Sequence, residues 1–268
     1  MTTHISNMLG VIFCEQRSMA TKIRFLGMPV KEAMLVIRSL IFLLLQIIIT
    51  PIFATLALLS FPFSRLTRYK IISQWAKMML PILRVVCGIR HEVKGIENLP
   101  TEPCIVLCKH QSAWETLALQ KIFPPQVWVL KRELFWIPFF GWALALTSPI
   151  GIKRSDGKGA MKQLLKQGKE RLAQGFCVVI FPEGTRIPYG QRGKYKIGGA
   201  MLAASSGVPV IPVAHNAGRL WGRNAFSKHP GVITMSIGAP IATKGLKADE
   251  INAKVEAWIE NEIQLLEH

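Results

Sequence analysis

Residues 109–115, Lys-His-Gln-Ser-Ala-Trp-Glu, combine a histidine and a carboxylate at a spacing that could support acid–base chemistry. The apolar run 104–108 precedes them and the apolar segment 117–119 follows, a pattern typical of a buried strand that turns into a helix. α/β proteins place their chemistry in such turns, at the carboxyl ends of strands. We therefore expect His110 to be a general base in the turn, and Glu115 to orient it from the first turn of the helix.

Whether this pair can meet depends on where the helix begins. Five residues along a regular helix turn by about 140°, so the two side chains meet only if His110 precedes the helix. Ser112 supports this arrangement, because Ser-x-x-Glu is a capping box with Ser112 as N-cap and Glu115 at the third helical position. The same box allows a second interpretation, in which Glu115 only caps the helix and His110 only bonds to the backbone.

Residues 181–186, Phe-Pro-Glu-Gly-Thr-Arg, follow the apolar run 177–180 and have a composition that suits an anion. Gly184 permits close approach of the backbone, Thr185 offers a hydroxyl donor, and Arg186 offers a bidentate fork to a phosphate. The alternative is an ordinary turn at the end of a strand, with an arginine–glutamate ion pair. The segment alone leaves both possibilities open.

Basic residues follow two further strand-like runs. Lys131 comes directly after 127–130, and Lys153 and Arg154 come after 148–152. Exposed basic pairs rarely have a specific role, but in a mainly parallel sheet the carboxyl ends of the strands share one edge. The sequence therefore predicts a histidine base beside a cationic pocket. Such an arrangement is suited to moving a group onto a phosphorylated alcohol.

The elements that must position these residues follow an alternating pattern from about residue 85 onward. Amphipathic helix patterns cover 157–174 and 251–266. We predict one α/β domain, 85–268, with a single mostly parallel mixed sheet flanked by helices. The strand-like runs are 85–93, 104–108, 127–130, 148–152, 177–181, 208–213 and 232–237.

The uncharged run 39–61 indicates a membrane segment. As one helix it would extend about 34 Å, enough to span a bilayer. Thr50 and Pro51 have the character of an N-cap and a first helical residue, so the run could instead form a two-helix hairpin within one leaflet. Basic residues flank both sides of the run, which favours the hairpin, with both of its ends on the cytoplasmic side.

Residues 1–84 as a whole are therefore predicted to be a leader and a membrane-anchoring helical region. Residues 1–30 show no clear periodicity and could be a flexible leader or an extension upstream of the true start. Residues 71–83 suit an interfacial helix. We expect the protein at the inner, cytoplasmic membrane, with the domain 85–268 on the cytoplasmic side.

The composition points to a polyanionic partner. The 268 residues include 33 lysines and arginines against 16 acidic residues, a net charge of +17, and half of the chain is hydrophobic. The apolar fraction favours anionic membrane lipids over nucleic acid, and no zinc-finger spacing or RNA-binding motif is present, so we expect no nucleic-acid partner. The five cysteines lie mostly in apolar runs, typical of reduced thiols, and we predict no metal site.

Four ordered blocks make the sequence similar to the glycerolipid acyltransferase family, and most closely to the bacterial 1-acyl-glycerol-3-phosphate acyltransferases. The resemblance covers about residues 85–240, and Lys131 and Lys196 also fall where such proteins place lysines. The family usually has aspartate where this chain has Glu115, whose extra methylene lengthens the reach by about 1.5 Å. The blocks are His110-x4-Glu115, 151–154 (Gly-Ile-Lys-Arg), 181–186 (Phe-Pro-Glu-Gly-Thr-Arg) and 208–213 (Val-Pro-Val-Ile-Pro-Val).

The resemblance implies a role for each of these residues. His110 would take the proton from the hydroxyl of the acceptor as it attacks an acyl thioester, and Glu115 would hold the imidazole tautomer. Glu183 would order its loop or contact polar groups of the acceptor. No covalent acyl-enzyme and no cofactor are expected. The acceptor's phosphate would be bound by Lys131, Arg154, Gly184, Thr185 and Arg186.

The implied reaction moves a fatty acyl chain from an acyl-carrier protein or coenzyme A to the 2-hydroxyl of lysophosphatidic acid, which gives phosphatidic acid. The sequence does not choose between the two donors. Other acceptors within the same family are a lyso-ornithine lipid, another lysophospholipid or glycerol 3-phosphate. Two alternatives from other classes are a non-catalytic membrane protein that binds anionic lipids and a hydrolytic thioesterase. Retention of both the histidine and the complete 181–186 block favours the acyltransferase.

Overall fold

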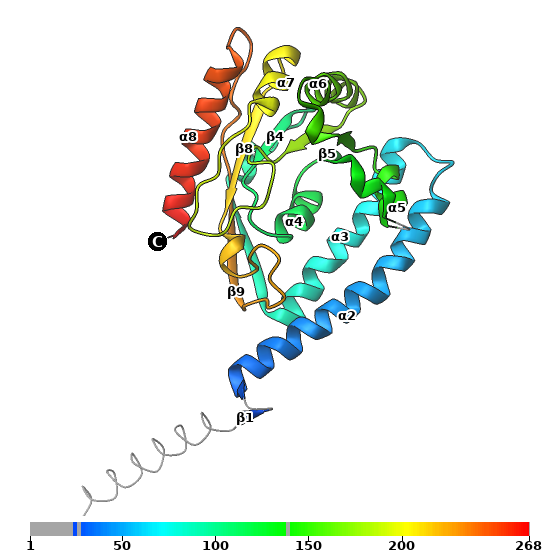
Figure 1. The fold of residues 1–268 in the computed structure, drawn as a ribbon, viewed down its shortest axis with the longest axis vertical. Coiled ribbons are helices and arrows are strands. Elements are labelled where there is room, and N and C mark those ends of the chain that lie inside the picture. The colour runs from blue at the N-terminus through cyan, green and yellow to red at the C-terminus, as the bar shows by residue number, and fades with distance from the viewer. Residues whose placement is uncertain (1–23, 26–27, 138–139, 268) are drawn as a thin grey trace, which may run out of the picture.

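A computed structural model describes residues 24–25, 28–137 and 140–267 of the chain (Figure 1). The predicted leader, 1–30, falls almost entirely outside these ranges. Within them, the strand-like runs of the sequence form the centre of the molecule and helices surround it.

The predicted strands come together as one mixed sheet with the order β3-β9-β8-β4-β7-β5-β6. In the described part of the chain, β8 and β9 are antiparallel neighbours and every other adjacent pair in this sheet is parallel. The predicted single, mostly parallel sheet is therefore confirmed. Short strands β1 (Arg24–Phe25) and β2 (Met28–Pro29) form a separate pair. The bounds are β3 (Ile89–Lys94), β4 (Ile105–Cys108), β5 (Gln126–Lys131), β6 (Ile150–Ile152), β7 (Cys177–Ile180), β8 (Val210–His215) and β9 (Gly231–Ile237).

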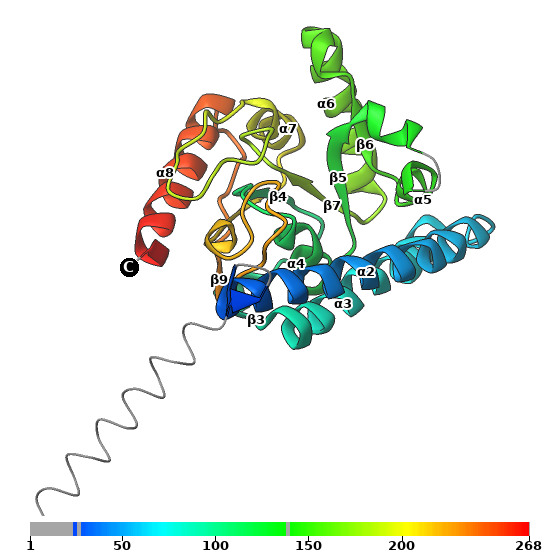
Figure 2. The ribbon, with the colours of Figure 1, turned by 60° about the horizontal axis from the view of Figure 1, so that its bottom comes forward.

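Helices cover both faces of this sheet, as the alternation along β4 shows. Val106 packs into the core cluster of α3 (Arg65–Cys87) and α4 (Trp114–Ile122). Ile105 and Leu107 point the other way, toward α6 (Gly157–Ala173), α7 (Gly198–Ser206) and α8 (Ala248–Glu267). Figure 2 shows α2 (Val30–Leu59) and α3 on one side of the sheet and α6, α7 and α8 on the other. The helices are thus separated into two layers, with the strands buried between them.

Shorter elements connect these layers. They are α5 (Phe140–Leu146) and four 3-10 turns, η1 (Ile96–Asn98), η2 (Arg132–Trp136), η3 (Arg154–Asp156) and η4 (Ala217–Arg219). Because η2 and η3 follow β5 and β6 directly, they lie at the edge of the sheet where the predicted basic residues are found.

The two-helix hairpin predicted within 39–61, with its second helix beginning at Pro51, is wrong, because a single helix covers nearly all of that run. The hairpin that the structure contains is formed by α2 and α3. The helix α2 continues through Pro51 to Leu59, and the chain turns back at 60–64 into α3. The hydroxyl of Thr50 accepts a hydrogen bond from Nε1 of Trp75 on α3, at 3.2 Å, and makes no cap. Packing of α2 against α3 thus maintains one helix at a residue that lacks an N–H donor.

Two further predictions change because α3 is longer than expected. It includes the predicted interfacial segment 71–83, whose Ala76, Met79 and Leu83 are buried in the core with α4. It also continues to Cys87, so the strand predicted from residue 85 begins only at β3. Gly88, with φ 71°, ends the helix in the left-handed conformation.

The outer side of α2 is apolar and exposed. Ile47, Ile48 and Ile52 are 58%, 62% and 56% exposed, and Leu59 at the turn is 68% exposed. Among the described residues, α2 is the one helix that is long and apolar enough to cross a membrane. An exposed apolar surface of this kind is typical of a membrane-contact site.

Gly95 offers a test of the packing between β9 and the turn after β3. It has φ +72°, and a Cβ there would overlap the carbonyl oxygen of Ile237. Gly245 has φ +78° with open space around it. We expect Gly245→Ala to lower the free energy of unfolding by about 1 kcal/mol, the cost of the left-handed conformation. Gly95→Ala should cost at least about 2 kcal/mol more, because the backbone must move.

Thermal unfolding of both variants in detergent, followed by circular dichroism, measures the difference. Equal losses in the two variants would contradict the close approach of Gly95 to Ile237.

Candidate active site

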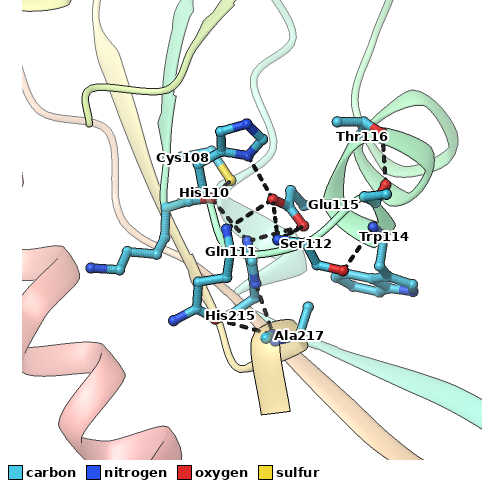
Figure 3. Close-up of polar contacts among 12 residues, drawn as sticks. Cys108, His110, Gln111, Ser112, Trp114, Glu115, Thr116, His215 and Ala217 are labelled. Carbon is cyan, nitrogen blue, oxygen red and sulfur yellow. Dashed lines mark hydrogen bonds and ion pairs between the residues drawn. The ribbon is translucent and has the colours of Figure 1, made fainter. Parts of the chain in front are cut away.

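His110 and Glu115 meet at the carboxyl end of β4, as predicted (Figure 3). Nδ1 of His110 lies 2.7 Å from Oε1 of Glu115, so the longer glutamate side chain still reaches the imidazole. The carboxylate accepts the Nδ1 proton, and Nε2 of the neutral ring is therefore free to accept another. The Glu115 side chain is fully buried, whereas that of His110 is 14% exposed and lines a cavity.

Glu115 also accepts backbone N–H groups before the helix α4. It therefore both contacts His110 and caps the chain there, so the two interpretations of the sequence are compatible. Its carboxylate accepts the backbone N–H groups of Gln111 and Ser112 at 3.0 and 2.9 Å. The hydroxyl of Ser112 accepts from the N–H of Trp114 at 3.1 Å. However, α4 begins at Trp114 with Ala113 as its N-cap, one residue later than the capping box predicted.

The environment of Glu115 keeps it ionised at neutral pH. Burial acts to raise its pKa, but the hydrogen bond from His110 and the N–H of Ser112 act to lower it, and the pKa lies below its ordinary value. A negative charge on this carboxylate is what would stabilise a protonated His110.

His215, at the end of β8, lies beneath the pair and was not predicted from the sequence. Its Nε2 lies 2.9 Å from the carbonyl oxygen of Lys109 and 3.9 Å from Glu115, and its Nδ1 accepts the N–H of Ala217. The ring therefore carries its single proton on Nε2 and is neutral. Burial lowers its pKa, which is consistent with this state. The sequence feature that could have indicated His215 is its position two residues after the 208–213 block.

The segment 181–187 contacts the backbone N–H, the carbonyl oxygen and the ring of His110. Oε2 of Glu183 accepts the His110 N–H at 2.9 Å, and the Ile187 N–H donates to the His110 carbonyl at 2.7 Å. The ring of Phe181 stacks on the imidazole, with the centroids 3.8 Å apart and the planes 12° from parallel. Two of the predicted motifs thus form one unit.

Glu183 lies below this unit and away from the cavity. Its carboxylate is fully buried and pairs with Nζ of Lys109 at 2.8 Å. Burial raises the pKa of Glu183 and outweighs the opposing effect of Lys109. This position favours the loop-ordering role of Glu183 over contact with an acceptor.

A cavity of about 1010 Å³ opens beside His110. Gly184 forms part of its wall with φ +69°, and a Cβ there would lie 2.7 Å from Nζ of Lys196. The side chain of Arg154 lies outside the described residues, and its backbone begins η3 next to this cavity. Lys196 and Arg223 are additional cations, of which the resemblance had indicated only Lys196. The charged and hydroxyl groups that line the cavity include Lys131, Thr185, Arg186, Lys196 and Arg223.

Much of the remaining lining of the cavity is apolar and includes residues of α2, α3, α5 and α6. Phe53 of α2 and Trp75 of α3 contribute to one part of the wall. Leu144 of α5 and Met161 and Leu164 of α6 contribute to another. The cavity therefore joins a histidine with cationic neighbours to a space that suits a hydrocarbon chain.

Known proteins share both the sequence and the fold. The acyltransferase family profile matches residues 90–216. A 1-acyl-sn-glycerol-3-phosphate acyltransferase of Pseudomonas aeruginosa is 51% identical over 196 residues, which are 72% of this chain and 76% of that protein. The alpha form of 1-acyl-sn-glycerol-3-phosphate acyltransferase from Mus musculus is 30% identical, over 68% of this chain and 65% of that protein.

A solved structure agrees in fold. The 1-acyl-sn-glycerophosphate acyltransferase PlsC of Thermotoga maritima superposes with a TM-score of 0.73 at 23% identity, covering 86% of this chain and 95% of that one. At this identity the superposition supports the architecture, and the sequence relationship to the Pseudomonas protein supports the family. The chain belongs to the acyltransferase family that includes the 1-acyl-sn-glycerol-3-phosphate acyltransferases.

Proposed function

We propose that the protein transfers an acyl chain from a thioester to the 2-hydroxyl of 1-acyl-glycerol 3-phosphate, which forms phosphatidic acid. The observation that carries this proposal is the His110–Glu115 pair, which opens into a cavity with both cationic and apolar walls. A lysophospholipid acceptor has a phosphate that suits the cationic wall and an acyl chain that suits the apolar wall. The relatives named for this reaction support the same conclusion.

In this mechanism Nε2 of His110 removes the proton of the acceptor hydroxyl while its oxygen attacks the thioester carbonyl. The attack forms the new oxygen–carbon bond and a tetrahedral intermediate, and the carbon–sulfur bond breaks when that intermediate collapses. Glu115 stabilises the imidazolium that exists between these events, and the imidazolium then returns the proton to the leaving thiolate. No covalent bond between the acyl chain and the protein is required.

The phosphate of the acceptor would be bound by Arg186 and the Thr185 hydroxyl, and Gly184, which has no side chain, would let the phosphate approach the loop closely. Arginine offers paired donors, and Lys131 and Lys196 add point charges in the same cavity. Arg154 remains a predicted member of this group. The donor is an acyl-carrier protein or acyl-coenzyme A, and either releases a thiol.

The proposed location is the cytoplasmic side of the inner membrane. The exposed apolar side of α2 supports membrane contact, and the net charge of +17 supports attraction to anionic lipids. We propose that the anchor lies within residues 1–84 and the catalytic domain within 85–268, with α3 crossing this boundary and packing in the core of the domain. This placement gives a lipid acceptor and a lipid product short paths to and from the bilayer.

His110→Ala should lower acyl transfer by a factor of about a hundred or more, because a general base contributes about 10²–10⁴-fold. The assay measures label moved from an acyl thioester to lysophosphatidic acid in detergent or bilayers. His229→Ala is the matched control, since His229 is exposed and lies away from the cavity lining. Full activity in a folded His110→Ala would show that His110 is not the general base. If the wild type formed no phosphatidic acid with either donor, lysophosphatidic acid would not be the acceptor.

Glu115→Gln should lower the free energy of unfolding by an amount that depends on pH. The pKa of Glu115 is lower in the folded chain than its ordinary value of 4.5, so its charge stabilises the fold above that pH. This contribution is lost as the pH falls through the folded pKa. The difference between the wild type and Glu115→Gln should therefore be constant near neutral pH and shrink as the pH falls below about 4.5. Thermal unfolding at about pH 7 and about pH 3 measures it, and a constant difference would contradict a lowered pKa.

Arg186→Met should raise KM for lysophosphatidic acid by about tenfold to a hundredfold, the effect of losing charged hydrogen bonds. Arg192→Met is the matched control, because Arg192 is 65% exposed and pairs with Glu256 on the surface. Steady-state kinetics at several acceptor concentrations separates KM from kcat. An unchanged KM in Arg186→Met would remove Arg186 from the phosphate site.

A further inference from the structure

A buried ion cluster connects the last helix of the chain to the residue next to His110. The side chain of Lys109 is fully buried, and its Nζ lies 2.8 Å from Oε1 of Glu183 and 2.9 Å from Oε1 of Glu260. The hydroxyl of Tyr195 donates to the same oxygen of Glu260 at 2.8 Å. Glu260 belongs to α8, which lies at one side of the sheet in Figure 1. None of the four side chains lines the cavity.

A contribution to the stability of the fold does not by itself explain such a cluster. Removing an ammonium from water costs several kcal/mol, and apolar residues of similar size often stabilise a core as well or better. The cluster also contains two carboxylates for a single ammonium. Because the carboxylates repel each other, both must be held in fixed positions around Lys109. Buried charges held in fixed geometry specify one arrangement of the chain. The arrangement specified here is that of the residues around His110.

The contacts form a continuous path from α8 to the candidate base. Glu260 fixes the ammonium of Lys109, and that ammonium holds one oxygen of Glu183. The other oxygen of Glu183 accepts the backbone N–H of His110 at 2.9 Å. Lys109 and His110 are consecutive residues, so Glu183 binds the side chain of one and the backbone of the other. A shift of Lys109 would therefore move both ends of this contact.

We infer that Glu260 positions His110, and that it does so through Lys109 and Glu183. The apolar side chains of Ile259 and Ile263 bury α8 against the sheet, so this helix supplies a rigid support. Glu256, one turn earlier on α8, pairs instead with the exposed Arg192. Glu256 therefore offers a matched control on the same helix. The kinetic part of the inference rests on the proposed function, whereas the structural part does not.

Hydrogen–deuterium exchange of the full chain in detergent tests the structural part. In Glu260→Gln, exchange should become about tenfold faster or more in peptides that cover 109–111 and 181–187, and should stay unchanged in β9 and α4. Tyr195→Phe should show the same pattern with a smaller increase, and Glu256→Gln should match the wild type. Unchanged exchange at 181–187, or an equal increase in every element, would overturn the inference.

Steady-state acyl transfer to lysophosphatidic acid tests the kinetic part. Glu260→Gln should lower kcat about tenfold, since small misplacements of a catalytic group cost up to about a hundredfold, and should leave KM unchanged. Glu256→Gln should keep the kcat of the wild type. A raised KM with unchanged kcat, or an equal loss in Glu256→Gln, would refute the positioning role. Absence of transfer by the wild type would refute the proposed function, and the exchange experiment would still decide the role of Glu260.

Discussion

The attachment of His110 to the segment 181–187 is the interaction on which the rest of the site depends. Both backbone groups of His110 and one face of its ring are bound by that segment. This attachment is possible because β4 and β7 are adjacent and parallel, so their carboxyl ends lie about 5 Å apart. Short turns after two neighbouring strands therefore suffice to place His110 beside the segment 181–187. The sheet order determines that these two motifs meet.

Two buried carboxylates divide the work of orienting His110, and their surroundings shift them in opposite directions. Glu115 contacts the imidazole and two backbone N–H groups, and its pKa is lowered. Glu183 contacts the backbone of the same residue, and its pKa is raised because burial outweighs its pairing with Lys109. The charge of Glu115 would stabilise the positive charge that the His110 ring acquires during the proposed reaction. Glu183 accepts the backbone N–H of His110, a group that stays neutral throughout the proposed reaction.

The features that the sequence predicted well are those set by local pattern. Apolar runs and the residues after them located the sheet, its reactive edge and the contact between His110 and Glu115. The features that were missed depend on distant contacts. Helix α2 continues through Pro51, which local preference marks as a helix start, and packs against α3, where Trp75 donates a hydrogen bond to Thr50. The ion pair of Lys109 and Glu260 joins residues 151 positions apart, and Glu260 alone has the pattern of a surface residue on an amphipathic helix.

The location of the cavity suggests where the selectivity for an acceptor arises. Phe53 and Trp75 of the hairpin line it, while other residues of α2 expose apolar side chains outward. An acyl chain that leaves a bilayer for such a cavity exchanges one apolar environment for another, so the hydrophobic effect provides little net driving force. In the proposed function, recognition would then come from the polar part of the lipid, through Arg186 and its cationic neighbours. The charged wall beside His110 would select the lipid that is acylated, and the apolar wall would mainly accommodate its chain.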